Sequence, residues 1–423
     1  MAWPIARLGL ALGLSGAFSS ALTGAAGEPV VRRFHFEAAP LQAGSVRVAP
    51  GDLYSVERGY GFEAGVPAVY FTTHLPEGNW KVTVTLRGVT GGGLATVKAE
   101  LRRLVLGPEP LAENETLTRT FIVNTRNPRI ALPEGAPARR VKLKAPRETT
   151  QEAWAWDDAL TLELHGATLS AVEIAPAQVP TVFLLGDSTL CDQSLEPFAS
   201  WGQMLPRFFE PTVAVANHGE SGETYRDSIS RGRLDKIVGI MRPGDTLVMQ
   251  FGHNDQKQIA AGTGGPFSTY QSEIKTHIAA VRRAGGIPVI VSPVERRRFD
   301  AAGNVDPTLA DYARAAAMTA EAEGVAFIDL NAKSMVLYAA LGPERSARAF
   351  AAPGGTIDNT HHNNYGAYQL ARCVALGLVE AKLAAAAALR PEFRTYDPAR
   401  PEPPEGFVVP PSSKFTQQRP LGN

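Results

Sequence analysis

The stretch Thr181-Val-Phe-Leu-Leu-Gly-Asp-Ser-Thr-Leu190 decides the fold of this chain. It is an apolar run that stops abruptly at Gly186, Asp187 and Ser188. Such a run is typical of a strand in a parallel sheet, because helices cover that strand on both faces. The polar residues then stand at the carboxyl edge of the sheet, where open α/β sheets bind their ligands. The stretch therefore predicts an α/β domain that presents a serine hydroxyl at this edge.

Far downstream, Asp358-Asn-Thr-His361 places a carboxylate and an imidazole three residues apart. A serine is a weak nucleophile until a base takes its proton, and the base needs a partner that fixes its tautomer. Ser188, His361 and Asp358 together meet both requirements. Each motif alone is common, and Gly-Asp-Ser by itself is more typical of a helix cap. The residues at the neighbouring strand ends therefore determine whether the two motifs indicate one site.

Two further predicted strands end in glycine and polar residues. Residues 213–217 are followed by His218-Gly-Glu-Ser-Gly-Glu-Thr224, and residues 245–251 by Gly252-His-Asn-Asp255. Because parallel strands bring their carboxyl ends to one edge, these segments are expected beside Ser188.

In this arrangement the chain resembles the SGNH (GDSL-type) hydrolases, and all four sequence blocks of that family are present in order. The resemblance implies that Ser188 is the nucleophile, His361 the general base and Asp358 its orienting partner. It also implies an oxyanion hole formed by the N–H groups of Ser188 and Gly222 and by the side chain of Asn254. No metal and no organic cofactor are implied.

The second block contains two glycines, Gly219 and Gly222. The family's glycine lies five residues after the asparagine that ends the strand, here Asn217, and is followed by a polar residue and Ser or Thr. Gly222, in Ser221-Gly-Glu-Thr224, matches that context.

The chain is more narrowly similar to bacterial rhamnogalacturonan acetylesterases over residues 180–385 and, less extensively, in the preceding β region. This likeness rests on the segments Gly186-Asp-Ser-Thr189, Ala199-Ser-Trp-Gly-Gln-Met-Leu205, Asn217-His-Gly-Glu-Ser-Gly222, Gln250-Phe-Gly-His-Asn-Asp-Gln-Lys257, Asp358-Asn-Thr-His361 and Asn364-Tyr-Gly-Ala367. It implies a secreted serine esterase that removes acetyl groups from pectin. The alternatives are an esterase for xylan or another acetylated glycan, and a carbohydrate-binding protein with an inactive hydrolase domain.

Basic and aromatic residues add candidates for sugar contact. Arg296, Arg297 and Arg298 follow the predicted strand 287–292, so they are the candidate cations for an acidic sugar, although such a run is usually solvated surface. Aromatic residues of the β region favour core packing over sugar stacking (Tyr60, Trp154, Trp156). Histidines beside the motifs lack the required spacing and are not assigned to the chemistry (His218, His253, His362).

The length of 423 residues allows two domains. Residues 28–178 alternate polar and apolar side chains between turns, which predicts an antiparallel β-sandwich, galactose-binding-like by the resemblance. After a linker near 175–180, residues 180–389 predict a flavodoxin-like three-layer α/β/α domain with five parallel strands at 181–186, 212–216, 245–251, 287–292 and 325–329. Helical patterns cover residues 270–284, 307–324 and 367–389. Residues 390–423 are Pro-rich and predict a tail that lies on the surface or is disordered.

The charge balance and the N-terminal residues indicate which partners and which cellular location to expect. Lys plus Arg and Asp plus Glu are 42 each, which gives no indication of nucleic-acid or membrane-surface binding. Residues 1–26 resemble a signal peptide, with an uncleaved anchor as the alternative, and predict a secreted or periplasmic protein with no membrane association after cleavage. Cys191 and Cys373 are expected to be separate core residues, with a disulfide as the alternative.

Overall fold

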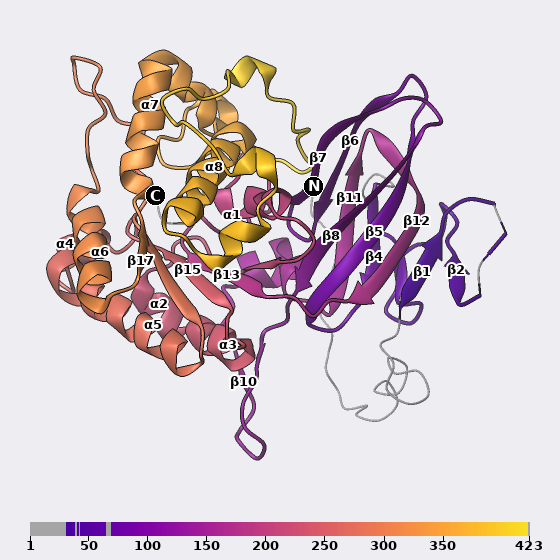
Figure 1. Cartoon of the computed structure of the whole chain (residues 1–423), viewed down its shortest axis with the longest axis horizontal. Coiled ribbons are helices and arrows are strands. Elements are labelled where there is room, and N and C mark those ends of the chain that lie inside the picture. Colours follow the sequence, from indigo (N-terminus) through magenta and orange to yellow (C-terminus); the bar gives the residue numbers. More distant parts are fainter. Residues whose placement is uncertain (1–30, 39, 42, 65–68, 422–423) are drawn as a thin grey trace.

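The computed structural model describes residues 31–421 except 39, 42 and 65–68. The signal peptide expected at residues 1–26 lies outside the described residues. In the described chain, a β-sandwich lies beside an α/β/α domain (Figure 1). None of the helices in this part of the chain is long and apolar enough to cross a membrane.

The α/β/α domain is built on five parallel strands, as predicted. They are β13 (Thr181–Gly186), β14 (Ala214–Asn217), β15 (Thr246–Gln250), β16 (Ile287–Val291) and β17 (Ala326–Ile328). Their order in the sheet is β14-β13-β15-β16-β17. The chain leaves β13 toward one neighbour and later returns on its other side, so the loop after β13 lies at the point where such sheets bind ligands.

Helices cover both faces of this sheet, which explains the unbroken apolar run of β13. Val182 and Leu184 pack against α1, α7 and α8, while Phe183 and Leu185 pack against α3, α5 and α6. The helices are α1 (Trp201–Met204), α2 (Tyr225–Ser230), α3 (Arg233–Ile240), α4 (Lys257–Ala260), α5 (Gln271–Arg283), α6 (Ala310–Glu323), α7 (Leu330–Ser346) and α8 (Asn364–Glu380).

The sandwich consists of two five-stranded sheets with orders β2-β1-β12-β5-β8 and β3-β4-β11-β6-β7. Pairing is antiparallel except between β1 and β2, which run parallel. The bounds are β1 (Arg32–His35), β2 (Ser45–Arg47), β3 (Tyr60–Phe62), β4 (Tyr70–His74), β5 (Gly78–Gly88), β6 (Gly93–Ala99), β7 (Arg103–Leu111), β8 (Thr116–Thr125), β11 (Ala159–His165) and β12 (Ala167–Pro176).

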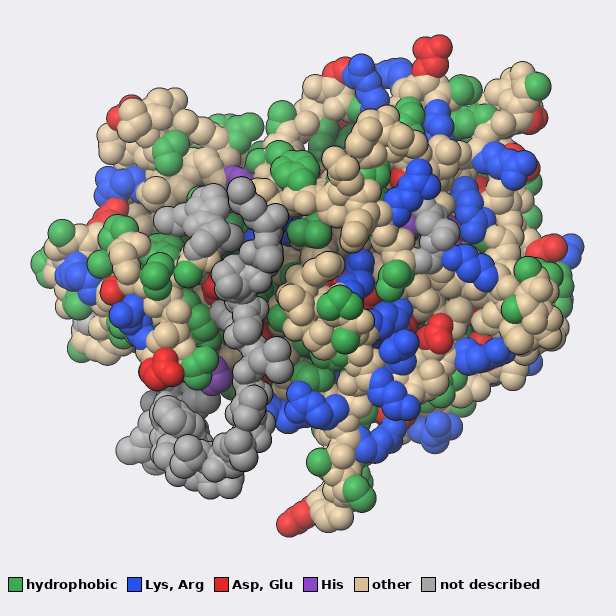
Figure 2. Space-filling view, turned by 180° about the vertical axis from the view of Figure 1, so that it is seen from behind, with side chains coloured by type: hydrophobic (Ala, Val, Ile, Leu, Met, Phe, Trp, Pro, Cys, Tyr) green, Lys and Arg blue, Asp and Glu red, His purple; other side chains and the backbone are tan. Residues whose placement is uncertain are grey.

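A two-stranded arm, β9 (Arg129–Ile130) and β10 (Arg139–Arg140), projects from the molecule. Figure 2 shows Lys and Arg side chains gathered around the base of this arm. The residues that follow β10 leave the arm and run along the α/β/α domain, where Lys142 N donates a hydrogen bond to the carbonyl of Arg231.

Buried charged groups fill the seam between the sandwich and the α/β/α domain. Arg103, 2% exposed, donates from Nε to Asp192 Oδ2 at 2.8 Å. Arg102 donates to the carbonyl oxygens of Gln193 and Phe198 and forms an ion pair with Glu196. All the acceptors lie on the loop that follows β13, so the sandwich fixes the position of that loop.

The C-terminal segment, residues 391–421, lies on the surface and contacts both units. Lys98 of β6 donates to the carbonyl of Pro410 and to Ser412, and Ser412 donates to Glu163 of β11. Beyond these contacts the segment pairs with Glu196 through two backbone hydrogen bonds. It therefore closes the seam along one side and continues toward the loop after β13.

Removing the buried guanidinium of Arg103 should destabilise the whole chain. Arg103→Ala leaves Asp192 short of a partner in a site without water access, and the free energy of unfolding should fall by about 3 kcal/mol or more. Urea unfolding followed by tryptophan fluorescence measures this change. Arg33→Ala is the control, because its ion pair with Glu173 has side chains 35% and 48% exposed and should contribute less than about 1 kcal/mol. Equal effects of the two substitutions would show that the seam does not depend on the buried pair.

Candidate active site

The structure brings together the three residues that the sequence predicts as a triad. His361 Nε2 lies 2.8 Å from Ser188 Oγ, and His361 Nδ1 lies 3.0 Å from Asp358 Oδ2. All three side chains are buried. In the tautomer that donates Nδ1–H to the carboxylate, Nε2 of His361 is the acceptor for a hydrogen bond from the Ser188 hydroxyl.

The loop before α8 holds Asp358 as an acceptor. Its Oδ1 accepts hydrogen bonds from the backbone N–H groups of Thr360 and His361 at 2.9 and 3.0 Å. Burial alone would raise the pKa of Asp358, but the hydrogen bonds from His361 outweigh it and hold that pKa well below its usual range. The carboxylate of Asp358 therefore stays ionised. The rings of Phe198 and His361 form a T-shaped contact, with their centroids 5.9 Å apart.

The turn that carries Ser188 is fixed by hydrogen bonds to its backbone. Asp187 accepts from the N–H and hydroxyl of Thr189, and the carbonyl of Ser188 accepts from Gln193 Nε2 at 2.7 Å and from Ser200 Oγ at 2.6 Å. A serine held in this way keeps its hydroxyl in one place relative to His361.

Gly222 and Asn254 line one open groove of about 690 Å³ at the carboxyl edge of the sheet. Gly222 has φ +73°, in the left-handed region that favours glycine, and Asn254 Nδ2 donates to the carbonyl of Glu223. Gly219 instead packs against Leu190 and leaves no room for a Cβ atom. Of the two glycines in this segment, the groove is therefore lined by Gly222.

Two of the three histidines beside the motifs are hydrogen-bonded to other groups, and His218 packs against Trp156, with ring centroids 6.1 Å apart. Nδ1 of His253 lies 3.3 Å from Asp187 Oδ2, beneath Asn254. Nε2 of His362 lies 2.7 Å from the Tyr338 hydroxyl, and burial together with His361 lowers the pKa of His362 to about 3. Neither side chain contacts Ser188 in the hydrogen bonds of the described residues.

The three arginines predicted as sugar contacts already have protein partners. Arg296 donates to Gln256 Oε1 and Thr308 Oγ1, at 3.0 and 3.1 Å. Arg297 donates to Asn359 Oδ1, and Arg298 forms an exposed ion pair with Asp306. They stand near the motif loops, but these partners hold the side chains.

The aromatic residues of the β region serve packing. Trp156 is buried in the seam, donates to Glu148 and carries the guanidinium of Arg126 4.3 Å above its ring. Lys414 Nζ lies 4.0 Å from the ring centroid of Trp154. Tyr60 packs against Phe34. Cys191 and Cys373 are buried and free.

Sequence analysis missed the contribution of the β region to this site. Lys144 forms an ion pair with Glu223, next to Gly222, and Arg147 donates to Gln193 and Glu220. Gln193 in turn holds the Ser188 carbonyl. No local motif marks Lys144 or Arg147, because their partners are 46 to 79 residues away in sequence.

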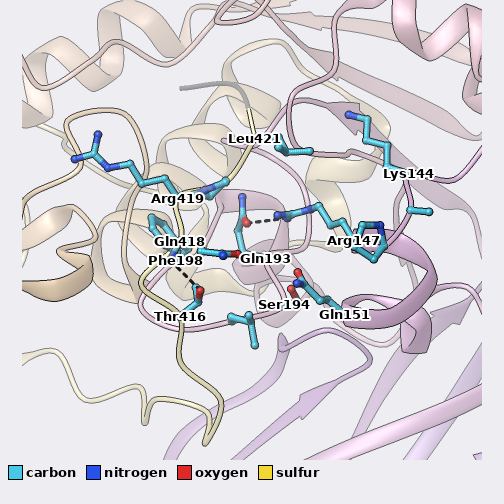
Figure 3. A pocket seen from close by; sticks show the side chains of 14 residues that line it. Lys144, Arg147, Gln151, Gln193, Ser194, Phe198, Thr416, Gln418, Arg419 and Leu421 are labelled. Carbon is cyan, nitrogen blue, oxygen red and sulfur yellow. Dashed lines mark hydrogen bonds between the residues drawn. The ribbon is translucent and has the colours of Figure 1, made fainter. Parts of the chain in front are cut away.

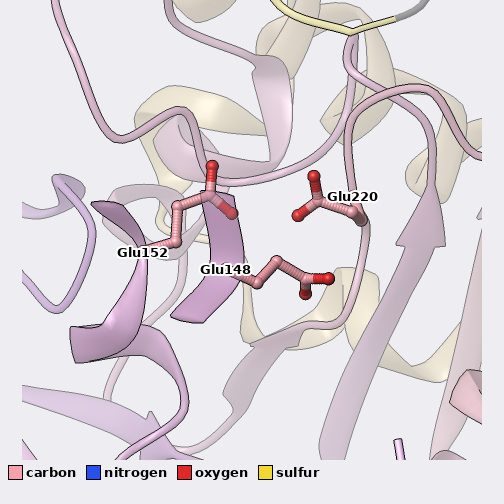
Figure 4. A group of neighbouring side chains, drawn as sticks. All are labelled: Glu148, Glu152 and Glu220. Carbon is pink, nitrogen blue, oxygen red and sulfur yellow. The ribbon is translucent and has the colours of Figure 1, made fainter. Parts of the chain in front are cut away.

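Three buried carboxyl groups, Glu148, Glu152 and Glu220, converge beneath the site and could ligate a metal ion by their spacing (Figure 4). Guanidinium groups already occupy their acceptors: Arg147 lies 2.6 Å from Glu152 and 2.9 Å from Glu220, and Arg233 lies 2.6 Å from Glu148. Burial and the adjacent Glu220 also raise the pKa of Glu152 well above its usual range. This donor set fits a guanidinium-bridged network joining the β region to the site better than it fits a metal ion.

Comparison with known proteins identifies relatives over both units. Residues 184–368 match the GDSL-like Lipase/Acylhydrolase family. The chain is 41% identical over 210 residues to rhamnogalacturonan acetylesterase RhgT of Bacillus subtilis, covering 47% of this chain and 89% of that protein. It is 27% identical over 378 residues to the uncharacterized esterase YxiM of the same organism, covering 82% of this chain and 90% of the relative. The crystal structure of YxiM superposes with a TM-score of 0.48 at 24% identity, over 84% of this chain and 100% of that one.

The match to RhgT extends over 89% of that relative, and the family match at residues 184–368 includes the segments that carry Ser188, Asn254 and His361. The chain belongs to the GDSL-like lipase and acylhydrolase family, within the SGNH superfamily of carboxylic ester hydrolases.

Proposed function

We propose that the protein is an exported serine acetylesterase that removes acetyl groups from acetylated rhamnogalacturonan through an acetyl-enzyme on Ser188. The observation that carries this proposal is the contact of Ser188 Oγ with His361 Nε2, at 2.8 Å, in a histidine oriented by Asp358.

In the proposed reaction His361 takes the proton of Ser188 while the serine oxygen attacks the acetyl carbonyl carbon. The resulting imidazolium is stabilised by the ionised Asp358. His361 then returns the proton to the sugar oxygen as the carbon–oxygen bond breaks. A water molecule, deprotonated by His361, attacks the acetyl-serine, and release of acetate restores Ser188.

The negative charge that develops on the carbonyl oxygen needs fixed hydrogen-bond donors. We assign the N–H groups of Ser188 and Gly222 and the amide of Asn254 to this oxyanion hole. The assignment is supported by the position of Gly222 and Asn254 on one groove. Fixed donors in a partly dry site are effective because they need no reorganisation during the reaction.

Acetylated rhamnogalacturonan is proposed as substrate because of the similarity to RhgT, whose name states that activity. An acetyl group is small, so discrimination between acetylated polymers must come from contacts with the sugar chain. Rhamnogalacturonan carries a carboxylate on alternate residues, and a site that serves it requires a cation near Ser188. Arg296, Arg297 and Arg298 were the candidates from the sequence, and Arg296→Gln tests them below.

Substitutions at the site should give a graded loss of esterase activity. Ser188→Ala and His361→Ala should each lower kcat on an aryl acetate by roughly 10⁴-fold or more, and the double variant should lose little beyond either, because the residues act as a unit. Asn254→Ala should lower kcat by about 10²–10³-fold through loss of one oxyanion donor. Steady-state kinetics with an aryl acetate measures all four variants.

His362→Ala is the matched control for the base. His362 adjoins His361 but contacts Tyr338, so this variant should lose far less activity than His361→Ala, provided that its thermal midpoint shows that it is folded. If the folded His362 variant were as inactive as His361→Ala, the assignment of the base would be wrong.

The substrate is tested by acetate release across a panel of acetylated polymers. We expect the highest kcat/KM on acetylated rhamnogalacturonan, with acetylated xylan and aryl acetates hydrolysed less efficiently. A preference for acetylated xylan would reject the pectin substrate and leave the esterase chemistry intact. Absence of acetate release from every ester would favour the carbohydrate-binding alternative.

Export is proposed from the apolar, uncharged run at residues 8–22 and the small residues Ala25 and Ala26. Cleavage should leave a mature chain that begins near Gly27 or Glu28. N-terminal sequencing of protein recovered from the medium or periplasm identifies the first residue. Membrane-bound protein that retains Met1 would instead indicate an uncleaved anchor.

A further inference from the structure

A second pocket, of about 270 Å³, is lined in part by the loop that follows Ser188 (Figure 3). Three parts of the chain that are distant in sequence build its wall: the segment after β10, the loop after β13 and the C-terminal segment. Its lining residues are Lys144, Ala145, Pro146, Arg147, Gln151, Gln193, Ser194, Leu195, Phe198, Thr416, Gln418, Arg419, Pro420 and Leu421.

Lining residues of this pocket contact each residue of the proposed triad. Phe198 packs against the ring of His361, and Gln193 donates to the carbonyl of Ser188. Arg419 Nε lies 3.7 Å from Asp358 Oδ2. A sugar chain bound here would therefore lie close to the residues proposed for catalysis.

Leu421 connects the pocket with the groove of the proposed oxyanion hole. It lines both, and its side chain lies against Gly222, where an added Cβ would meet it at 3.0 Å. Lys144 also lines both. The two hollows therefore share part of their walls and lie next to each other.

The lining carries positive charge and amide groups without a carboxylate. Its cations are Lys144, Arg147 and Arg419, and three glutamines supply donors and acceptors (Gln151, Gln193, Gln418). Amides match the hydroxyl groups of a sugar, and guanidinium and ammonium groups match a carboxylate. The pocket thus has the chemistry of a site for an acidic sugar.

The cations differ in how firmly the protein holds them. Arg147 is fixed by Glu152 and Glu220, and Lys144 by Glu223 at 3.0 Å. Arg419 is 45% exposed, and its ion pair with Asp358 spans 3.7 Å. Its guanidinium therefore loses the least on turning to a ligand carboxylate.

We propose that this pocket binds a uronate carboxylate of the polymer chain, with Arg419 as the principal contact to the carboxylate and Lys144 as the second. The inference rests on the proposed function and deepens it. It replaces Arg296 to Arg298 by cations from the β region and from the C-terminal segment, both outside the five-stranded domain. Those two parts of the chain then determine which polymer is deacetylated.

The test compares one acetylated oligosaccharide in two forms, with its uronate carboxyl groups intact and after their reduction to neutral alcohols. The quantity measured is the ratio of kcat/KM between the acidic and the neutral form. Arg419→Gln should lower this ratio by about tenfold or more, and Lys144→Gln should lower it in the same direction, because each loses a charge-assisted contact to the carboxylate.

Matched controls come from the same segments. Arg400→Gln removes a cation that is 88% exposed on the C-terminal segment, and Lys142→Gln removes an exposed cation two residues before Lys144. Both should keep the wild-type ratio. Arg296→Gln is the competing variant, and it should also keep the ratio.

Each outcome decides between the hypotheses. A wild-type enzyme that hydrolyses both forms equally, or a ratio that falls with Arg296→Gln but not with Arg419→Gln, overturns the subsite while the esterase function stands. A rise in activity of Arg419→Gln on both forms also overturns it, because the C-terminal segment would then obstruct the site. Failure of the wild type to release acetate from either form would contradict the proposed function itself.

Discussion

A buried guanidinium group costs free energy unless acceptors surround it, and this constraint organises the molecule around the loop after β13. Arg102 and Arg103 of the sandwich find their acceptors on that loop, at Asp192, Gln193 and Phe198. Arg147 adds a third contact through the side chain of Gln193, which holds the carbonyl of Ser188. The serine is thus positioned from two sides, by the sheet whose strand it follows and by arginines of the β region that precedes it in the chain. Separating the two units would leave these charges without their acceptors.

Periodic pattern and motif spacing were sufficient to predict the α/β/α architecture and the segments that meet at its edge. The run 181–186 is apolar on both faces because helices cover both, and this is a local property of the sequence. Helix α7 was missed, because Gly342 and Pro343 interrupt its pattern near the end and its apolar positions are widely spaced. The parallel pairing of β1 with β2 was also missed, since strands of three and four residues give too little alternation to set a direction.

The side chains at and around the triad also differ in whether the sequence alone could reveal their role. Ser188, Asp358 and His361 belong to motifs whose chemistry can be recognised a few residues at a time. Lys144, Arg147 and Arg419 belong to no motif, and their positions depend on how distant segments cross one another. Arg296 to Arg298 were conspicuous in the sequence because they are consecutive, yet a charge run is informative only when its partners are known. Here the partners are protein groups such as Gln256, Asn359 and Asp306.

The residues that belong to motifs are those assigned to the reaction, whereas the residues that belong to no motif are those proposed to select the polymer. In the proposed reaction, hydrolysis of an acetyl ester requires a nucleophile, a base and oxyanion donors, and the residues assigned to these roles come from the ends of neighbouring parallel strands and the loop before α8. Because the acetyl group offers little to recognise, a preference for one polymer must be generated by groups that contact the sugars on either side. The two hollows near the proposed triad are lined in part by the segment after β10 and by residues 416–421, which the sheet does not position. Changes in these two segments can therefore alter the polymer that is bound while leaving the reacting groups in place. The buried seam between the two units holds the segments at a fixed position relative to the serine.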